Sequence, residues 1–260
     1  MTLRIGIAGL TGQVGRLVVE EIRAVGLTVA GGTIREGTTK TIPQAVSAFT
    51  RIEDLAAVSD VVIDFSHADT TAASAAALVA RGIAWVNGNS GLSASDEAAM
   101  HAAAERIPVV SANSFAPTAV LVPEVMTRLG GGLPAAEYDV EILETHHHHK
   151  VDAPSGTAIA IGKLIARARG QVFDEVAVLG RRGHVGPRKP GAIGFGAIRA
   201  GEIVGESSVL FLADDEEIVV TRRVFDRRVY ATGAVLAARW AVRQAPGLYG
   251  MRDVLAGAAS

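Results

Sequence analysis

The 260-residue sequence contains no cysteine, which excludes a disulfide framework, a thiolate zinc site and a cysteine nucleophile. It carries no excess of positive charge, because 25 lysines and arginines face 27 aspartates and glutamates, so nucleic acid is not an expected partner. No apolar run approaches the roughly 18 residues of a membrane helix, and the N-terminus lacks the pattern of a secretory leader. We therefore expect a cytoplasmic protein without a membrane partner.

The sequence is rich in apolar residues and in glycine: 49% of its residues are hydrophobic and 29 are glycine. Such a chain can bury a large core, and its length fits two modest domains or one large α/β unit. In the first half, apolar runs typical of buried strands alternate with stretches of helical periodicity. This alternation predicts a parallel sheet covered by helices, with strands at residues 3–8, 27–31, 60–65, 83–87 and 107–111 and helices at 14–25, 68–81 and about 94–106.

The pattern changes near residue 117, where the regular alternation of strands and helices ends. The sequence now predicts a helix at 118–129 ended by the run Gly130-Gly-Gly-Leu-Pro134, a strand at 138–144, a helix at 154–167, a hairpin of 203–212 with 217–222, and a helix at 231–244. We expect an α/β protein with two domains. Residues 1–116 and 227–260 form a Rossmann-like dinucleotide-binding domain in this prediction, and residues 117–226 form a mixed α+β domain.

A glycine-rich turn, Gly9-Leu-Thr-Gly12-Gln-Val-Gly15, lies between the first predicted strand and the first helix. Glycines let the backbone approach a pyrophosphate, and the start of a helix offers free N–H groups to an anion. The spacing is a variant of the dinucleotide fingerprint, and its place between a strand and a helix supports a nucleotide site. The alternative is a tight turn that binds no ligand.

The end of the second predicted strand bears on the choice between NAD and NADP. An acidic residue there holds the ribose of NAD, whereas an arginine accommodates the phosphate of NADP. If Ile34 takes the acidic position, Arg35 is left as a phosphate partner and NADPH is favoured. If Glu36 takes it, NADH remains open.

Four of the seven histidines stand together at positions 146–149, directly before Lys150 and after a predicted strand. Histidine titrates near neutrality and can donate a proton, and a lysine can hold a carboxylate or stabilise a forming anion. Ser155, Gly156 and Thr157 open the next predicted helix and offer donors to an anionic group. The pattern indicates a proton donor beside an anion site.

Two other interpretations of the histidines are a solvated loop and a metal site. Consecutive residues of an extended segment point to opposite faces, so we expect at most alternate histidines to converge. No carboxylate or cysteine stands at a recognised metal-ligand spacing, so we predict no metal.

The glycine turn and the stretch Glu144-Thr-His-His-His-His-Lys-Val-Asp-Ala-Pro-Ser-Gly-Thr157 together resemble the bacterial dihydrodipicolinate reductase family. Further similar segments are Gly183-His184-Val-Gly186, Ile193-Gly194-Phe195, the run from Arg199 to Glu206, and the run from Gly247 to Leu255. The resemblance spans essentially the whole chain, and the histidine stretch is its most specific part.

The resemblance implies a Rossmann-like domain, a second domain for substrate binding and tetramerisation, and hydride transfer from NADPH or NADH to a cyclic dicarboxylate imine. By position it implies His146 as the proton donor and Lys150 as the second catalytic residue. His147, Ser155, Gly156 and Thr157 would bind the dicarboxylate substrate. The implied cofactor-binding residues are Gly9, Gly12, Gln13, Val14, Arg35, Gly88, Ser90 and Asn113.

Two segments depart from the family pattern. The usual Gly-Thr-Thr-Gly loop is here Gly88-Asn89-Ser90-Gly91, and the usual Ala-Asn-Phe-Ser is Ala112-Asn113-Ser114-Phe115. These departures leave open a related reductase that accepts another cyclic imine or dicarboxylate. A nucleotide-binding regulator without catalysis is a further alternative, which the intact histidine, lysine and Ser-Gly-Thr set disfavours.

Two minor features have simple interpretations. The basic segment that contains Arg181 and Arg188 is expected to be a solvated or subunit-contact loop. His67 follows the predicted strand 60–65, where α/β sheets bind ligands, or it caps the next helix.

Overall fold

The computed structural model describes residues 2–258, which fall into two compact units. Unit 1 comprises the residues up to Pro117 together with those from Arg227 onward, and unit 2 comprises Thr118–Asp226. Within residues 2–258, no helix is both long and apolar enough to cross a membrane.

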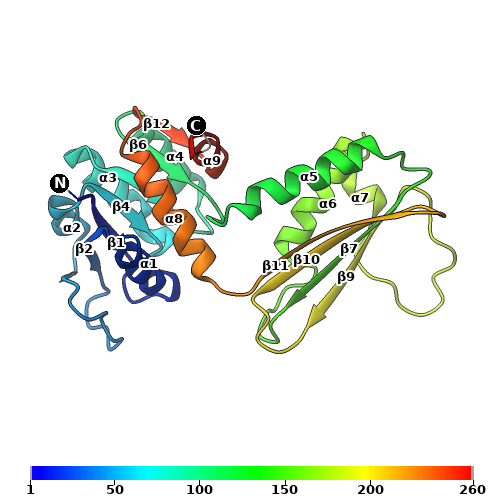
Figure 1. The fold of residues 1–260 in the computed structure, drawn as a ribbon, viewed down its shortest axis with the longest axis horizontal. Coiled ribbons are helices and arrows are strands. Elements are labelled where there is room, and N and C mark those ends of the chain that lie inside the picture. Colours follow the sequence, from blue (N-terminus) through cyan, green and yellow to red (C-terminus); the bar gives the residue numbers. More distant parts are fainter. Residues whose placement is uncertain (1, 259–260) are drawn as a thin grey trace. The chain divides into compact units, whose positions relative to one another are not determined.

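Unit 1 is built on a parallel sheet of seven strands, as the alternating pattern predicts (Figure 1). The strands, in sheet order, are β12 (Gly247–Tyr249), β6 (Pro108–Ser111), β5 (Ala84–Asn87), β4 (Val61–Asp64), β1 (Arg4–Ala8), β2 (Thr28–Thr33) and β3 (Ala48–Phe49). The helices of this unit are α1 (Gln13–Ala24), α2 (Ile52–Val58), α3 (Thr71–Arg81), α4 (Ala94–Ala104), α8 (Arg228–Ala241) and α9 (Met251–Ala258), with a 3-10 turn at Ala68–Thr70.

Local signals in the sequence set several ends of these elements. All four residues of β4 and of β5 are buried, as expected for strands covered on both faces. Gly82 adopts a left-handed conformation that ends α3, and Ser93 and Asp96 form the reciprocal capping box that opens α4. Helix α8 packs against α1 and the sheet, so the chain returns to unit 1 after unit 2.

Unit 2 contains a mixed sheet of five strands in the order β11 (Glu217–Val224), β10 (Gly205–Leu212), β7 (Asp139–His146), β9 (Ile193–Arg199) and β8 (Ala177–Val178). Strand β10 is antiparallel to both β11 and β7, whereas β9 runs parallel to β7 and β8. The helices are α5 (Thr118–Gly132), α6 (Gly156–Ala168) and α7 (Phe173–Val176). Helices α5 and α6 lie along one face of the sheet (Figure 1).

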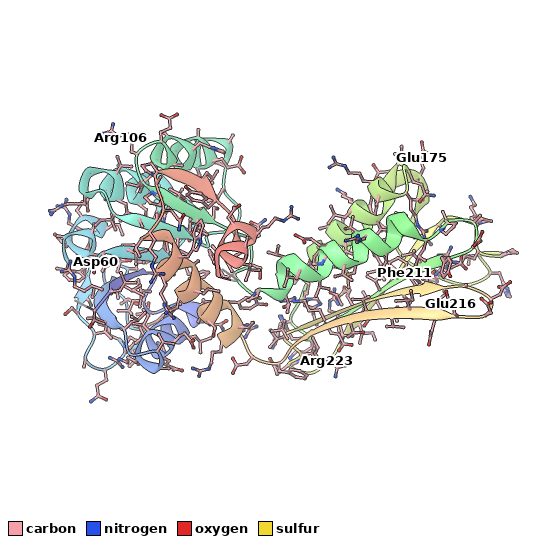
Figure 2. The ribbon with its side chains drawn as sticks, turned by 45° about the horizontal axis from the view of Figure 1, so that its top comes forward. Asp60, Arg106, Glu175, Phe211, Glu216 and Arg223 are labelled. Carbon is pink, nitrogen blue, oxygen red and sulfur yellow. The ribbon has the colours of Figure 1, made fainter. Side chains whose placement is uncertain are left out.

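Alternation along β7 assigns its side chains to the two faces of this sheet. Val140, Ile142 and Glu144 are buried, and the first two join a core that includes Phe211 of β10, which lies between the sheet and its helices (Figure 2). Leu143 belongs to the opposite face, which keeps large exposed apolar side chains. Because Glu144 and His146 are two residues apart, both belong to the face that the helices cover.

Helix α5 ends within the predicted run Gly130–Pro134, but it continues past its predicted last residue, Leu129, to Gly132. Gly130 is buried, and a Cβ there would lie 2.8 Å from Cγ2 of Ile165 on α6. The glycine therefore permits close packing of two helices instead of stopping one.

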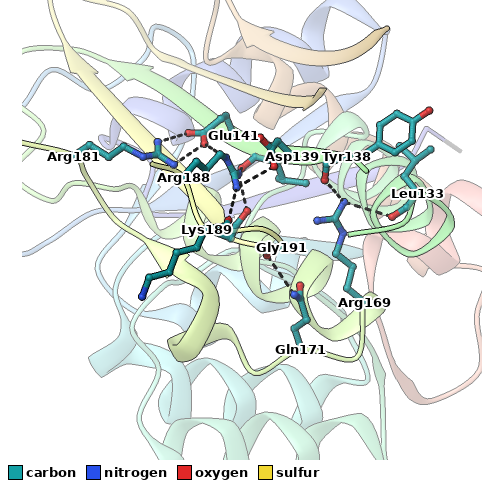
Figure 3. Close-up of polar contacts among 12 residues, drawn as sticks. Leu133, Tyr138, Asp139, Glu141, Arg169, Gln171, Arg181, Arg188, Lys189 and Gly191 are labelled. Carbon is teal, nitrogen blue, oxygen red and sulfur yellow. Dashed lines mark hydrogen bonds and ion pairs between the residues drawn. The ribbon is translucent and has the colours of Figure 1, made fainter. Parts of the chain in front are cut away.

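Two arginines of the basic loop bind a carboxylate on the open face of the sheet, in the cluster that Figure 3 shows. Arg181 donates to both carboxylate oxygens of Glu141 at 2.9 Å, and Arg188 donates to Oε1 at 3.2 Å. Arg188 also donates to the carbonyls of Val140 and Ala192. These arginines therefore fix the loop to β7 and to the residue that precedes β9.

Candidate active site

The glycine turn between β1 and α1 is shaped by close backbone contacts. Gly9 has φ 85°, and a Cβ there would lie 2.5 Å from the carbonyl oxygen of Phe65. A Cβ on Gly15 would lie 2.3 Å from the carbonyl oxygen of Gly9, so this glycine lets α1 approach the turn. Gly12 is less crowded, because its Cβ would lie 3.1 Å from the same oxygen.

The turn leads into a helix start that suits an anion. Gly12 is the N-cap of α1, no side chain caps it, and the first turn contains no acidic residue. Beside it lies a cavity of about 750 Å³ whose lining includes Gly9, Gly12 and Arg35. Uncapped N–H groups, a close backbone and a nearby guanidinium fit the pyrophosphate and ribose phosphate of a dinucleotide.

Sequence reasoning missed several residues of this cavity. Lys40 and Arg51 line it and add positive charge, and Glu53 adds a carboxylate. The available signal was that the chain between β2 and α2 follows the carboxyl end of a parallel strand, where ligands bind. His67 both lines the cavity and caps the 3-10 turn, where its Nδ1 accepts from the amide of Asp69 at 3.4 Å.

Five of the predicted cofactor residues lie outside the cavity lining: Gln13 and Val14 open α1, Gly88 and Ser90 follow β5, and Asn113 follows β6. A Cβ on Gly88 would lie 2.2 Å from the ring of Phe65, so this loop packs directly on the end of β4. The neighbouring Asn89 is 7% exposed, and both polar atoms of its side chain are buried without a hydrogen-bond partner. An orphaned amide at the carboxyl end of a parallel strand is suited to a polar ligand group.

In unit 2, the predicted proton donor His146 ends β7 beside a buried carboxylate. Its Nδ1 lies 2.5 Å from Oε2 of Glu144, and its side chain is 16% exposed. The Glu144 side chain is 0% exposed. The imidazole is thus held at one nitrogen by a group that solvent does not reach.

Glu144 is also bound by the neighbouring strand and by the start of α6. Arg199 of β9 donates Nη2 to Oε1 at 2.6 Å and Nη1 to Oε2 at 2.8 Å, and the amide of Ser155 donates to Oε1 at 3.1 Å. Burial raises the pKa of Glu144, but the bonds from Arg199, His146 and Ser155 outweigh it and hold the pKa below its ordinary value. The carboxylate is therefore ionised at neutral pH.

Lys150 follows the histidines in the loop after β7. Its Nζ donates to Oδ1 of Asp152 at 2.6 Å, and the Lys150 side chain is 21% exposed. This bond lowers the pKa of Asp152 from its ordinary value. Arg199 reaches the same loop, donating Nη2 to the carbonyl of Asp152 at 2.6 Å, so one guanidinium holds both the strand and the loop.

The predicted substrate residues surround the start of α6. Ser155 is its N-cap, with Oγ accepting from the amide of Ala158 at 3.3 Å, and Gly156 and Thr157 form the exposed first turn. His147 is half-buried in the loop just after β7. The structure thus links His146 and Ser155 directly through Glu144, whereas Lys150 is connected to this group only through Asp152 and Arg199.

The expectation that neighbouring histidines point apart is wrong for His148 and His149. These residues lie in a turn instead of an extended strand, and their ring centroids are 4.0 Å apart. Glu202 lies near both, with Oε1 at 3.6 Å from Nε2 of His148 and 3.8 Å from Nε2 of His149. All three residues are exposed, and their possible ligand atoms lie within 4.8 Å of one another, so consecutive histidines converge here with a carboxylate.

Unit 1 has a parallel sheet with a glycine turn and a charged cavity, and unit 2 has a mixed sheet with a histidine and a lysine near its end. These features define a class, the two-domain oxidoreductases of the Rossmann type. Comparison with known proteins narrows this class. Residues 3–115 match the family model described as dihydrodipicolinate reductase, N-terminus, and residues 118–255 match dihydrodipicolinate reductase, C-terminus. The chain belongs to the dihydrodipicolinate reductase family.

Individual relatives agree over nearly the full length. The chain is 52% identical to the 4-hydroxy-tetrahydrodipicolinate reductase of Granulibacter bethesdensis, covering 98% of this chain and 97% of the relative. It is 50% identical to that of Gluconacetobacter diazotrophicus, covering 97% of both.

Among solved structures, the dipicolinate-bound dihydrodipicolinate reductase from Paenisporosarcina sp. TG-14 has the same fold, with a TM-score of 0.79 and 20% identity over 97% of this chain and 99% of that one. GenD2 from gentamicin A biosynthesis, solved with NAD, has a TM-score of 0.57 at 15% identity over 98% of this chain and 91% of that one.

Proposed function

We propose that this protein uses NAD(P)H and a proton to convert 4-hydroxy-tetrahydrodipicolinate to tetrahydrodipicolinate, with loss of the 4-hydroxyl group as water, in lysine and diaminopimelate biosynthesis. The observation that carries the proposal is that the buried Glu144 binds both His146 and the start of α6, with Lys150 paired to Asp152 in the loop between them. A dicarboxylate needs cations and N–H donors, and a reduced product needs a proton. Residues 146–157 supply the cations, the N–H donors and the proton donor.

In this proposal unit 1 binds the cofactor, which supplies the hydride when bound. The start of α1, with Gly9, Gly12, Gln13 and Val14, holds the pyrophosphate through N–H groups. Arg35 holds the ribose phosphate of NADPH, and this cation makes NADPH the favoured form. Gly88, Ser90 and Asn113 contact the nicotinamide end from the loops after β5 and β6.

Unit 2 binds the substrate and completes the reduction. His147, Ser155, Gly156 and Thr157 bind the two carboxylates, using side-chain donors and the N–H groups of the first turn of α6. His146 gives its proton to the reduced substrate, and Lys150 stabilises the negative charge that develops before the proton arrives.

Unit 2 also forms the contacts of a homotetramer in this proposal. The sheet face opposite α5 and α6 exposes Leu143, Ile198 and Val219, which are 43%, 54% and 48% exposed. Apolar side chains gathered on an open sheet face are typical of a subunit interface. Sedimentation should give the mass of four chains, whereas a monomer would contradict the assignment.

The activity is tested by adding the condensation product of pyruvate and aspartate semialdehyde to the protein with NADPH or NADH. Loss of reduced-nicotinamide absorbance is expected, and no turnover with either cofactor would reject the proposal. His146→Gln and Lys150→Ala should each lower kcat by about 10² to 10⁴ with unchanged cofactor binding. His101→Gln, on the exposed side of α4, is the control and should leave kcat unchanged.

A further inference from the structure

Glu144 has contacts that suit a role beyond holding the fold together. Its carboxylate is 0% exposed, yet one of its oxygens lies 2.5 Å from Nδ1 of the proposed proton donor. We propose that Glu144 is a positioning residue, which fixes the tautomer and orientation of His146 so that Nε2 carries the transferred proton, while Arg199 holds Glu144 in place. This inference rests on the proposed function, because it assigns Glu144 a role in the same reaction.

The tautomer follows from the chemistry of the two groups. An ionised carboxylate has no hydrogen to donate, so the nitrogen of His146 that faces it must carry one. With Nδ1 committed to Glu144, Nε2 is the nitrogen that gains and loses a proton.

Arg199 makes this arrangement possible. A carboxylate with no solvent exposure needs a partner, and Arg199 supplies two bonds of 2.6 and 2.8 Å from the residue directly opposite His146 on β9. Because Arg199 keeps Glu144 ionised, the carboxylate does not take the proton from His146.

The remaining neighbours of His146 add no second carboxylate contact among the described hydrogen bonds. On β10 the facing residue is Gly205, where a Cβ would lie only 3.1 Å from Nε2 of His146, so the missing side chain leaves room for the ring. The next residue, Glu206, is bound to Arg223 of β11. In the loop, the carboxylate of Asp152 is bound to Lys150.

The strand itself offers a matched control for Glu144. Glu141 also lies on β7 and also receives two bonds from one arginine, at 2.9 Å each from Arg181 (Figure 3). It belongs to the opposite face of the sheet from His146. Glu141→Gln therefore removes a paired carboxylate from the same strand without touching the imidazole.

The first experiment measures the tautomer of His146 in the unaltered protein by ¹⁵N NMR of the imidazole nitrogens, assigned with His146→Gln. We expect the neutral ring to carry its hydrogen on Nδ1. A hydrogen on Nε2 would overturn the proposal. This readout requires no turnover, so it tests the positioning role even if the proposed reaction fails.

The second experiment compares Glu144→Gln with Glu141→Gln. Glu144→Gln should lower kcat by about 10²-fold with unchanged KM for NADPH, and in the same ¹⁵N spectrum the neutral ring of His146 should no longer carry its hydrogen on Nδ1 alone. Glu141→Gln should leave both kcat and the Nδ1 tautomer unchanged. A drop in kcat in Glu144→Gln with the tautomer unchanged would mean a structural role only and would overturn the proposal.

A third variant covers the case in which Glu144→Gln does not fold. Gly205→Ala changes no charge but places a methyl group against the Nε2 side of the ring. We expect lower kcat with the hydrogen of the neutral ring still on Nδ1. Unchanged kcat would show that the placement of Nε2 does not matter, contrary to the proposal.

Discussion

Replacing Arg199 by Met should destabilise unit 2 strongly, because it leaves a buried carboxylate without its main partner. The Glu144 side chain is 0% exposed and that of Arg199 is 19% exposed, so the pair is largely withdrawn from water. Breaking a buried ion pair costs about 3–5 kcal/mol. The bonds to Glu144 from His146 and from the Ser155 amide remain in the variant. We therefore expect a loss in the free energy of unfolding at the lower end of this range, about 3 kcal/mol, which lowers Tm by roughly 10 °C.

The pH dependence of this loss follows from the pKa of Glu144. In the native protein that pKa lies below its ordinary value of 4.5, so the stability that it contributes is complete above pH 4.5 and is lost as the pH falls through the folded value. Without Arg199, burial is less opposed and the pKa of Glu144 rises. Protonation of Glu144 in Arg199→Met then removes the unpaired charge. The difference in the free energy of unfolding between the native protein and this variant should therefore become smaller as the pH falls.

Urea unfolding of the native protein, Arg199→Met, Glu144→Gln and the double variant measures these quantities. The double variant removes both charges, so it should be more stable than Arg199→Met alone. Lys150 and Asp152 give a contrast: their pair is 21% and 52% exposed, and Asp152→Asn should cost less than about 1 kcal/mol. A loss below about 1 kcal/mol in Arg199→Met, or no recovery in the double variant, would refute the reasoning.

Two further predictions concern the cofactor and the packing of unit 1. Arg35→Ser should raise the KM for NADPH by about 10- to 100-fold and leave the KM for NADH unchanged, because it removes one charged hydrogen bond to the ribose phosphate. Equal effects on the KM of both cofactors would contradict the assignment of Arg35. Gly233→Ala should lower the free energy of unfolding by about 3 kcal/mol or more, since its Cβ would lie 1.7 Å from the backbone oxygen of Phe115. The control is Gly132→Ala, where a Cβ meets nothing within 4 Å, and its free energy of unfolding should stay unchanged or rise by up to about 1 kcal/mol. Thermal unfolding of both alanine variants measures these changes. Equal stabilities would show that the contact at Gly233 is unimportant.

The main elements of the fold could be predicted because strand and helix periods differ clearly in this sequence. The buried runs became β1, β4, β5 and β6, and the capping residues Ser93 and Gly82 marked helix ends. Short elements such as β3, β8 and β12 went unpredicted, because strands of two or three residues have no readable period. Gly130 misled for another reason: its role is tertiary, against Ile165, and no local signal reveals that.

The candidate site was only partly accessible from the sequence. His146, Lys150 and Ser155 are close in the chain, so their spacing revealed them. Arg199 lies 55 positions from Glu144, and only the parallel pairing of β7 with β9 brings the two together. The contact between His148, His149 and Glu202 depends likewise on a turn that the sequence pattern did not indicate.

The most direct test of the central claim is a crystal structure of the protein with NADPH and a pyridine dicarboxylate bound together. The account predicts Nε2 of His146 and Nζ of Lys150 within hydrogen-bond distance of the dicarboxylate, with its carboxylates at the start of α6. A complex in which both side chains turn away from the ligand would contradict it.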